Sequence, residues 1–101
     1  MTKKSNDNIL AQPLAPNLHL DTLAVRMSLP PSQFGENSEA LFLTSGYVQS
    51  SAESAARRFA GEEDGYTYGR TSNPTVTSFE MRLAAMEGTE AAIATSSGMA
   101  A

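Results

Sequence analysis

The sequence contains no cysteine, no tryptophan and a single histidine among its 101 residues. The lack of cysteine excludes a disulfide framework and any metal site built on thiolates. His19 cannot form a metal site alone, and a plain surface role is favoured for it over catalysis. The only lysines are Lys3 and Lys4, both close to the N-terminus.

Long apolar runs and an excess of basic residues are also missing. No stretch approaches the roughly 20 apolar residues that a membrane-spanning helix needs, and no apolar segment of the signal-peptide type follows the first residues. The net charge is −4 with a pI near 4.8, whereas a general nucleic-acid binder would carry a basic patch. We therefore expect a soluble, cytoplasmic protein with no nucleic-acid or membrane partner.

Two short helices are predicted in the first part of the chain, after a polar segment, residues 1–17, that we interpret as a flexible tail. Apolar residues recur at helical spacing over Leu18–Met27. Ser50 and Glu53 form the pattern of a capping box, which predicts a helix over Ser51–Phe59, and Gly61 follows where a C-terminal cap is expected.

The last turn of that second helix carries Arg57 and Arg58. We interpret them as solvated charges that complement the helix dipole rather than as ligand-binding residues. Leu29–Asn37 contains two prolines and a glycine and is expected to be a loop, and Leu41–Leu43 and Tyr47–Val48 are expected to be extended.

The most regular pattern begins at Pro74. Asn73 is suited to cap a helix and Pro74 to occupy its first position. The apolar residues that follow have steps of three and four, which predicts one face of a helix ending at Gly88; they are Val76, Phe79, Leu83 and Met86. Ala91–Thr95 is then expected to be a short buried strand, and Ser96–Ala101 a turn that enters another helix.

A strand followed by a turn of small residues and a helix is typical of the beginning of a parallel α/β sheet. Such a sheet needs several strands with helices on both faces. The sequence therefore predicts an α/β fold and the front part of a larger protein.

The segment before Asn73 carries the first candidate binding site. If it is extended, side chains two residues apart point to the same side, so Tyr68 and Arg70 would face one target. The planar guanidinium of arginine fits a phosphate, and a tyrosine hydroxyl adds a donor. The alternative is that Tyr66 and Tyr68 only cover the edge of a core.

A second candidate site lies at Ser96–Met99. Backbone N–H groups at a helix N-terminus favour an anion, and Gly98 lets the backbone approach a ligand closely. The alternative is an ordinary helix start made of small residues. Ser97 is a weak candidate for a nucleophile, because Thr95 stands where the hydrolase pattern G-x-S-x-G requires a glycine.

Three motifs in order, Tyr68–Thr75, Leu83–Gly88 and Ser97–Ala101, resemble the Cys/Met-metabolism family of pyridoxal-phosphate enzymes. That family includes cystathionine γ-synthase, methionine γ-lyase and the homoserine-ester sulfhydrylases. The resemblance runs from about Asp21 to the C-terminus. The stretches upstream of Tyr68 are most similar to the O-succinylhomoserine sulfhydrylase branch; they are Thr22–Arg26, Glu39–Phe42 and Ala55–Gly61.

The resemblance implies pyridoxal 5′-phosphate as the cofactor and a large domain of the aspartate-aminotransferase type, fold type I. Residues 18–74 would form an N-terminal arm and residues 75–101 the start of the cofactor-binding domain. Tyr68 and Arg70 would bind the cofactor phosphate of the neighbouring subunit, whereas Ser97, Gly98 and Met99 would contact the phosphate in their own subunit's site.

The resemblance further implies a homo-oligomer, a tetramer built from dimers, that takes an amino-acid ester and sulfide and forms homocysteine for methionine biosynthesis. The family's reaction starts from an imine between the cofactor and a lysine. Lys3 and Lys4 are not in that lysine's context, so the catalytic lysine is expected beyond Ala101. We expect the 101-residue chain to be inactive alone. The alternatives are a non-catalytic product that contributes only interface and phosphate contacts, a cystathionine γ-synthase or methionine γ-lyase relative, and an unrelated α/β fragment.

Overall fold

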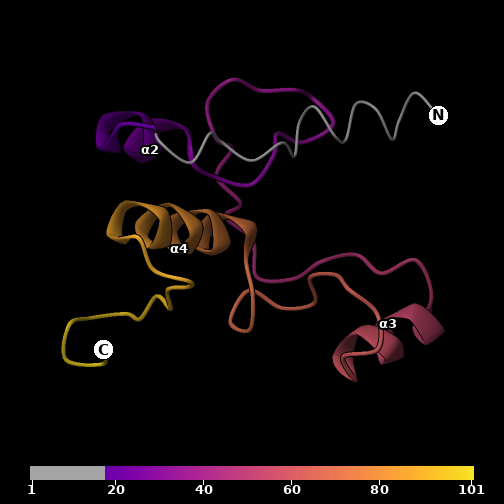
Figure 1. Cartoon of the computed structure of the whole chain (residues 1–101). Coiled ribbons are helices and arrows are strands. Elements are labelled where there is room, and N and C mark those ends of the chain that lie inside the picture. The colour runs from indigo at the N-terminus through magenta and orange to yellow at the C-terminus, as the bar shows by residue number, and fades with distance from the viewer. Residues whose placement is uncertain (1–17) are drawn as a thin grey trace.

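The computed structural model describes residues 18–101, which contain three helices (Figure 1). They are α2 (Leu20–Arg26), α3 (Ala52–Phe59) and α4 (Pro74–Glu87). All three lie where the sequence predicts helices. The tail expected over residues 1–17 lies outside the described residues, and the predicted division at residue 75 stays a prediction.

Helix α4 begins and ends as its sequence predicts. The side-chain oxygen of Asn73 accepts hydrogen bonds from the backbone N–H groups of Thr75 at 2.8 Å and Val76 at 3.4 Å, and Pro74 occupies the first position, where no N–H is needed. At the other end Gly88 adopts a φ of 69°, a left-handed conformation that glycine reaches without strain. These two ends fix the length of the helix.

Helix α3 begins one residue later than predicted. Its N-cap is Ser51, whose hydroxyl accepts from the backbone N–H of Ser54 at 3.0 Å, so the capping box assigned to Ser50 and Glu53 is wrong. Ser51 can take this role because the side-chain oxygen of an N-cap residue accepts from the backbone N–H two or three residues later in the chain, here that of Ser54. Gly61, just after the helix, has a φ of 78°, consistent with the predicted C-terminal cap.

Helix α2 packs on α4, and polar groups join the two. The Ser78 hydroxyl of α4 accepts from the backbone N–H of Leu29 at 3.2 Å. Arg82, one turn further along α4, donates to the carbonyl oxygen of Met27 at 2.9 Å and pairs with the carboxylate of Glu39. These contacts fix the segment that follows α2 to the middle of α4, and Figure 1 shows α2 lying beside α4.

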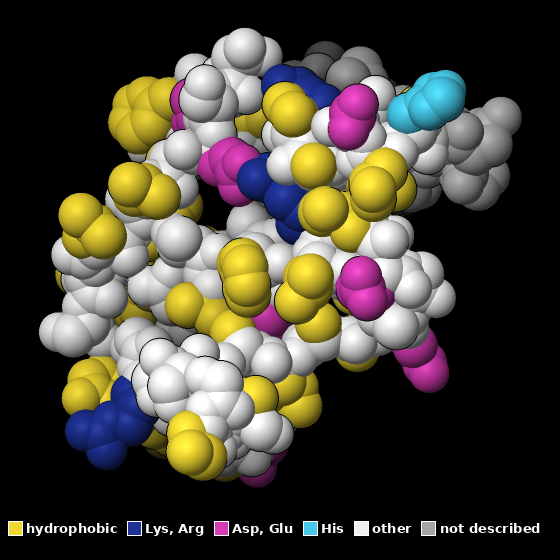
Figure 2. Space-filling model, turned by 90° about the vertical axis from the view of Figure 1, so that its left-hand side faces the viewer, with side chains coloured by type: hydrophobic (Ala, Val, Ile, Leu, Met, Phe, Trp, Pro, Cys, Tyr) yellow, Lys and Arg dark blue, Asp and Glu magenta, His cyan; other side chains and the backbone are white. Residues whose placement is uncertain are grey.

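The apolar stripe predicted on α4 is largely exposed in the structure. Phe79 remains 56% exposed, and Val76 and Leu83 are also exposed. Figure 2 shows hydrophobic side chains spread over the surface of the molecule. Among residues 18–101 the only hydrophobic residue that is buried is Ala84, so this part of the chain has almost no core.

The described residues contain no β-strand, so the strand predicted over Ala91–Thr95 is wrong and the α/β fold is not confirmed here. A strand needs a neighbour for its backbone, and none of the described residues supplies one. The N–H of Ala94 instead donates to the carboxylate of Glu80 at 2.7 Å. The one β-bridge among residues 18–101 is an isolated antiparallel bridge between Gly46 and Tyr68.

The turn predicted over Ser96–Ala101 is present in the structure. The backbone N–H of Ala101 donates to the carbonyl oxygen of Ser97 at 3.2 Å, and that of Ala100 donates to the Ser97 hydroxyl at 3.2 Å. Ser97 thereby behaves as a helix N-cap, which is the local chemistry that the sequence predicts for this position.

Candidate functional site

Tyr68 and Arg70 touch each other through their side chains. The guanidinium carbon of Arg70 lies 5.4 Å from the centroid of the Tyr68 ring, and its Nη2 atom lies 3.4 Å from the Tyr68 hydroxyl. A cation over an aromatic face is attracted by the ring. The prediction that the two side chains face one target is therefore consistent with the geometry.

The backbone conformation between Tyr68 and Arg70 differs from the prediction. The chain is not extended through Arg70 but turns there, because the N–H groups of Thr71 and Ser72 both donate to the carbonyl oxygen of Tyr68, at 3.0 and 3.1 Å. The Thr71 hydroxyl donates to the same oxygen at 2.9 Å. Before the turn, the N–H of Gly69 donates to the carbonyl oxygen of Ser45. Tyr68 and Arg70 meet across a turn held by local hydrogen bonds rather than along a strand.

Arg70 differs from the other arginines of residues 18–101 in what it contacts. Arg57 and Arg58 bind the carboxylate of Glu63, Arg82 binds that of Glu39, and Arg26 donates to Asn37. Arg70 lies within ion-pair distance of no described carboxylate, and its only described acceptor is the tyrosine hydroxyl. Both members of the pair are exposed, so the guanidinium is open to an anionic ligand.

Arg57 and Arg58 turn out to be more than solvated charges. Both bind Glu63, at 3.1 and 2.8 Å, so the interpretation of them as free dipole-compensating groups needs this correction. The Ser54 hydroxyl, which donates to Glu63 at 2.5 Å, and the two arginines hold the pKa of Glu63 below its ordinary value, against the opposing effect of desolvation. The arginines serve the local structure.

The second candidate site, Ser96–Met99, contains two backbone N–H groups without a described acceptor. No hydrogen bond within the described part of the chain uses the backbone N–H of Gly98 or Met99. Both residues are exposed, and Met99 is 97% exposed. Two N–H groups at the start of a turn, beside the Ser97 hydroxyl, can donate to a phosphate oxygen.

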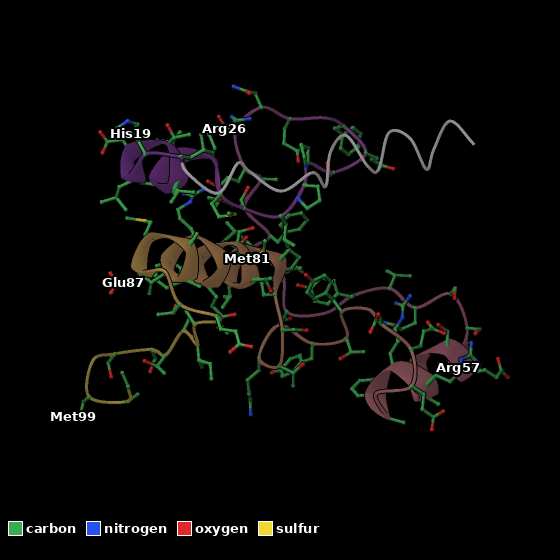
Figure 3. The ribbon with its side chains drawn as sticks, viewed as in Figure 1. His19, Arg26, Arg57, Met81, Glu87 and Met99 are labelled. Atoms are coloured by element: carbon green, nitrogen blue, oxygen red, sulfur yellow. The ribbon has the colours of Figure 1, made fainter. Side chains whose placement is uncertain are left out.

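The structure does not bring the two candidate sites together. No described hydrogen bond or ion pair joins Tyr68 or Arg70 to residues 97–99. In Figure 1 the loop before α4 lies at the N-terminal end of that helix, whereas the C-terminal segment turns back beneath its other end. Figure 3 places Met99 in that final turn, well apart from Arg57 of α3.

A hollow in the described part of the chain lies elsewhere. It has a volume of about 910 Å³ and is lined by α2, the segment after it and one side of α4, including Met27, Pro30, Phe42, Met81 and Arg82. None of the predicted site residues lines it. His19, labelled in Figure 3 beside α2, is exposed, as the surface interpretation expects.

Residues 18–101 contain neither a metal-binding cluster nor a membrane-spanning helix. No cluster of three or more histidine, aspartate or glutamate side chains is placed to hold a metal ion. No helix there has the length and apolar character to cross a membrane.

Comparison with known proteins identifies the family. Residues 21–101 match the family described as Cys/Met metabolism PLP-dependent enzyme. The chain belongs to this family. The cofactor of the family is pyridoxal phosphate, and membership implies fold type I.

Curated relatives share the same region. The chain is 57% identical over 81 residues to the O-succinylhomoserine sulfhydrylase of Pseudomonas aeruginosa and 55% identical over 80 residues to that of Mycobacterium tuberculosis. It is 45% identical over 82 residues to an L-methionine gamma-lyase of Fusobacterium nucleatum. These matches cover 79–81% of this chain and 20–21% of the relatives, so the chain spans about a fifth of their length.

The residues present fit the phosphate of that cofactor. A phosphate ester is a doubly charged anion that takes charge-assisted hydrogen bonds from a guanidinium, a hydroxyl and backbone N–H groups. Arg70 and Tyr68 offer the first two, and Gly98 and Met99 offer the third. Sequence reasoning proposed these four residues, together with Ser97, as phosphate ligands, and they stay a prediction. Sequence reasoning did not identify Gln49, which helps to fix the loop before α4. Its side-chain amide donates to two backbone carbonyl groups, and such contacts leave no pattern in the sequence.

Proposed function

We propose that the chain is the N-terminal part of a PLP-dependent γ-replacement enzyme of methionine biosynthesis. The enzyme forms homocysteine from O-succinylhomoserine, or O-acetylhomoserine, and sulfide: the acyloxy group leaves the γ-carbon as a carboxylate, and sulfur takes its place. The geometric observation that carries the proposal is the exposed Tyr68–Arg70 pair, whose guanidinium has no carboxylate partner among the described residues. The choice of reaction rests on the two sulfhydrylase relatives, at 55–57% identity.

In this proposal the residues of the chain bind and orient the cofactor. The guanidinium of Arg70, through its fork, and the hydroxyl of Tyr68 would hold the phosphate of the cofactor. Both act on the site of the neighbouring subunit, which makes a homo-oligomer necessary. Gly98 and Met99 donate their N–H groups to the phosphate in their own subunit's site, beside Ser97. When bound, pyridoxal phosphate supplies an electron sink for the loss of the γ-substituent.

The separation of the two groups of donors supports this division of roles. In one chain the two groups of donors lie apart, one before α4 and the other in the segment that follows it, and would have to move toward each other to share a single phosphate. Two chains, each contributing one group to each site, need no such movement. A dimer with two-fold symmetry would then contain two equivalent sites.

A second candidate function is a product without catalytic activity that lends only interface and phosphate contacts. The reading frame beyond Ala101 distinguishes the two. A frame that continues into a segment with a cofactor-binding lysine supports the enzyme, and a frame that stops there contradicts it.

The reaction is tested with the product of the complete reading frame, purified and loaded with pyridoxal phosphate. We expect homocysteine from O-succinylhomoserine and sulfide, with a higher kcat/KM than for release of methanethiol from methionine. Cystathionine formed from cysteine is the third reaction to compare. A preference for methionine or for cysteine would assign the enzyme to the lyase or the cystathionine γ-synthase branch and overturn the sulfhydrylase proposal.

A further inference from the structure

The side-chain amide of Gln49 joins two segments that lie side by side. Its Nε2 atom donates to the carbonyl oxygen of Tyr47 at 3.0 Å and to that of Tyr66 at 3.1 Å. Its oxygen accepts from Arg58 at 2.8 Å. The three contacts agree on one orientation of the amide, because the flipped amide would set an oxygen against two carbonyl oxygens and an NH₂ against a guanidinium.

The bridge made by Gln49 reaches the backbone of the Tyr68–Arg70 loop. Tyr66 lies two residues before Tyr68, and the segment of Gln49 runs antiparallel to it. The backbones of these segments share one isolated bridge, Gly46 with Tyr68, and the hydrogen bond from Gly69 to Ser45. A single bridge specifies register weakly. The amide of Gln49 adds a cross-link at the end of the pairing where no backbone bond is described.

Helix α3 contacts the side chain of Gln49 through Arg58. Arg58, which donates to the Gln49 oxygen, also donates to Glu63 at 2.8 Å. Glu63 accepts a hydrogen bond from the hydroxyl of Ser54, whose residue is only 3% exposed. Gln49 is therefore tied to a buried group of α3, and a side chain held in this way resists displacement better than one on a free loop.

We propose that Gln49 is a positioning residue that holds the loop of Tyr68 and Arg70 in the orientation required to bind a phosphate group. The inference rests on the proposed function, in which that pair binds the cofactor phosphate. Gln49 touches neither the cofactor nor a reacting atom. It acts through the carbonyl oxygen of Tyr66, so its loss affects the binding of phosphate and leaves the chemistry of the other cofactor groups unchanged.

The test uses the complete enzyme, freed of cofactor, and two probes: inorganic phosphate and pyridoxal, which lacks the phosphate. Gln49→Leu keeps the size of the side chain and removes all three hydrogen bonds. We expect it to weaken phosphate binding about three- to tenfold and to leave pyridoxal binding unchanged. Gln49→Glu keeps an acceptor for Arg58 but cannot donate to the two carbonyl oxygens, so we expect it to resemble Gln49→Leu.

Gln33→Leu is the matched control, because Gln33 is exposed in the loop after α2 and has no described side-chain hydrogen bond. It should bind both probes like the parent enzyme. If Gln49→Leu binds phosphate like the parent while Arg70→Ala does not, the positioning role is wrong and the proposed function stands. If Arg70→Ala also binds phosphate normally, the proposed function fails and this inference with it. An equal loss of pyridoxal affinity in Gln49→Leu would indicate general damage and overturn the inference.

Discussion

The side chain of Asn73 donates to the carbonyl oxygen of Phe42 at 2.9 Å across 31 positions of the sequence. The same side chain caps α4 with its oxygen, and its Nδ2 atom lies 3.3 Å from the hydroxyl of Tyr47. Asn73 is buried, with 9% exposed. It thus fixes the start of α4 to the segment that pairs with Tyr68, so the loop that carries Tyr68 and Arg70 is anchored at both ends.

The two roles of Asn73 can be separated by substitution. Asn73→Asp keeps the capping oxygen and loses the donor, whereas Asn73→Ala loses both. We expect the free energy of local opening at the start of α4 to fall by about 0.5–1.5 kcal/mol in Asn73→Asp. In Asn73→Ala the cap is lost as well, which adds about 0.5–2 kcal/mol. Hydrogen exchange of the Thr75 and Val76 amides in the complete enzyme measures both. Equal effects of the two substitutions would show that the bond to Phe42 contributes nothing.

The affinity for the cofactor tests Arg70 directly. Arg70→Ala in the complete enzyme removes a charge-assisted contact worth about 1.5–3 kcal/mol. The dissociation constant for pyridoxal phosphate should then rise by roughly one to two decades. Arg70→Lys should recover only part of the loss, because an ammonium group cannot form the two parallel bonds of the fork. Spectrophotometric titration of the cofactor-free enzyme provides the values. Full recovery by lysine would indicate a simple charge effect rather than a fork.

Local chemistry made much of this fold predictable from the sequence. The cap at Asn73, the proline after it and the glycine at position 88 act within one turn of the chain, so the ends of α4 could be predicted. The sequence predicted that Tyr68 and Arg70 face one target along an extended segment, whereas the chain turns between them. The two side chains are long enough to meet across that turn.

What the sequence did not reveal depends on distant partners. The strand expected over Ala91–Thr95 has the composition of a buried strand, but a strand forms only beside another strand. Ser78 gave no sign that it would hold the backbone of Leu29, 49 positions away. Gln49 likewise forms its contact with Tyr66 across 17 positions. Side chains that bind distant backbone groups leave no periodicity to detect.

The small buried core predicts the behaviour of the 101-residue chain by itself. Ala84 is the only buried hydrophobic residue among residues 18–101, and Phe79 is 56% exposed on the apolar stripe of α4. So little burial cannot offset the conformational entropy of ordering the chain. We expect no sharp thermal transition by circular dichroism, and binding of a dye that recognises exposed apolar surface. A cooperative transition in a monomeric sample would contradict this prediction.

The stability of the α3 region should depend on pH through Glu63. The hydrogen bond from Ser54, followed by Arg57 and Arg58, holds the pKa of Glu63 below its ordinary value of 4.5. A carboxyl whose pKa is lowered in the folded state stabilises that state above the ordinary value, and the contribution is lost as the pH falls through the lowered pKa. At pH 7 the parent enzyme should protect the amides of α3 from hydrogen exchange better than Glu63→Gln does.

Below the lowered pKa of Glu63 that difference in protection should vanish, because the parent's carboxyl is then protonated too. Glu62→Gln is the matched control, since Glu62 is exposed and has no described ion pair. It should match the parent at every pH. A difference between parent and Glu63→Gln that persists unchanged into acid would show that the charge of Glu63 is not what holds α3.

In the proposed enzyme Tyr68 and Arg70 serve the active site of the neighbouring subunit. The direct test is to mix Arg70→Ala subunits of the complete enzyme with subunits altered only at the cofactor-binding lysine, at limiting cofactor. In a mixed dimer the Arg70→Ala subunit supplies the lysine of one site and its neighbour supplies Arg70, so one site is intact. With random pairing about half of the dimers are mixed, and activity should reach roughly a quarter of the parent's. If native mass spectrometry detects mixed dimers and they remain as inactive as the two altered homodimers, Arg70 acts within its own subunit and the proposal is wrong.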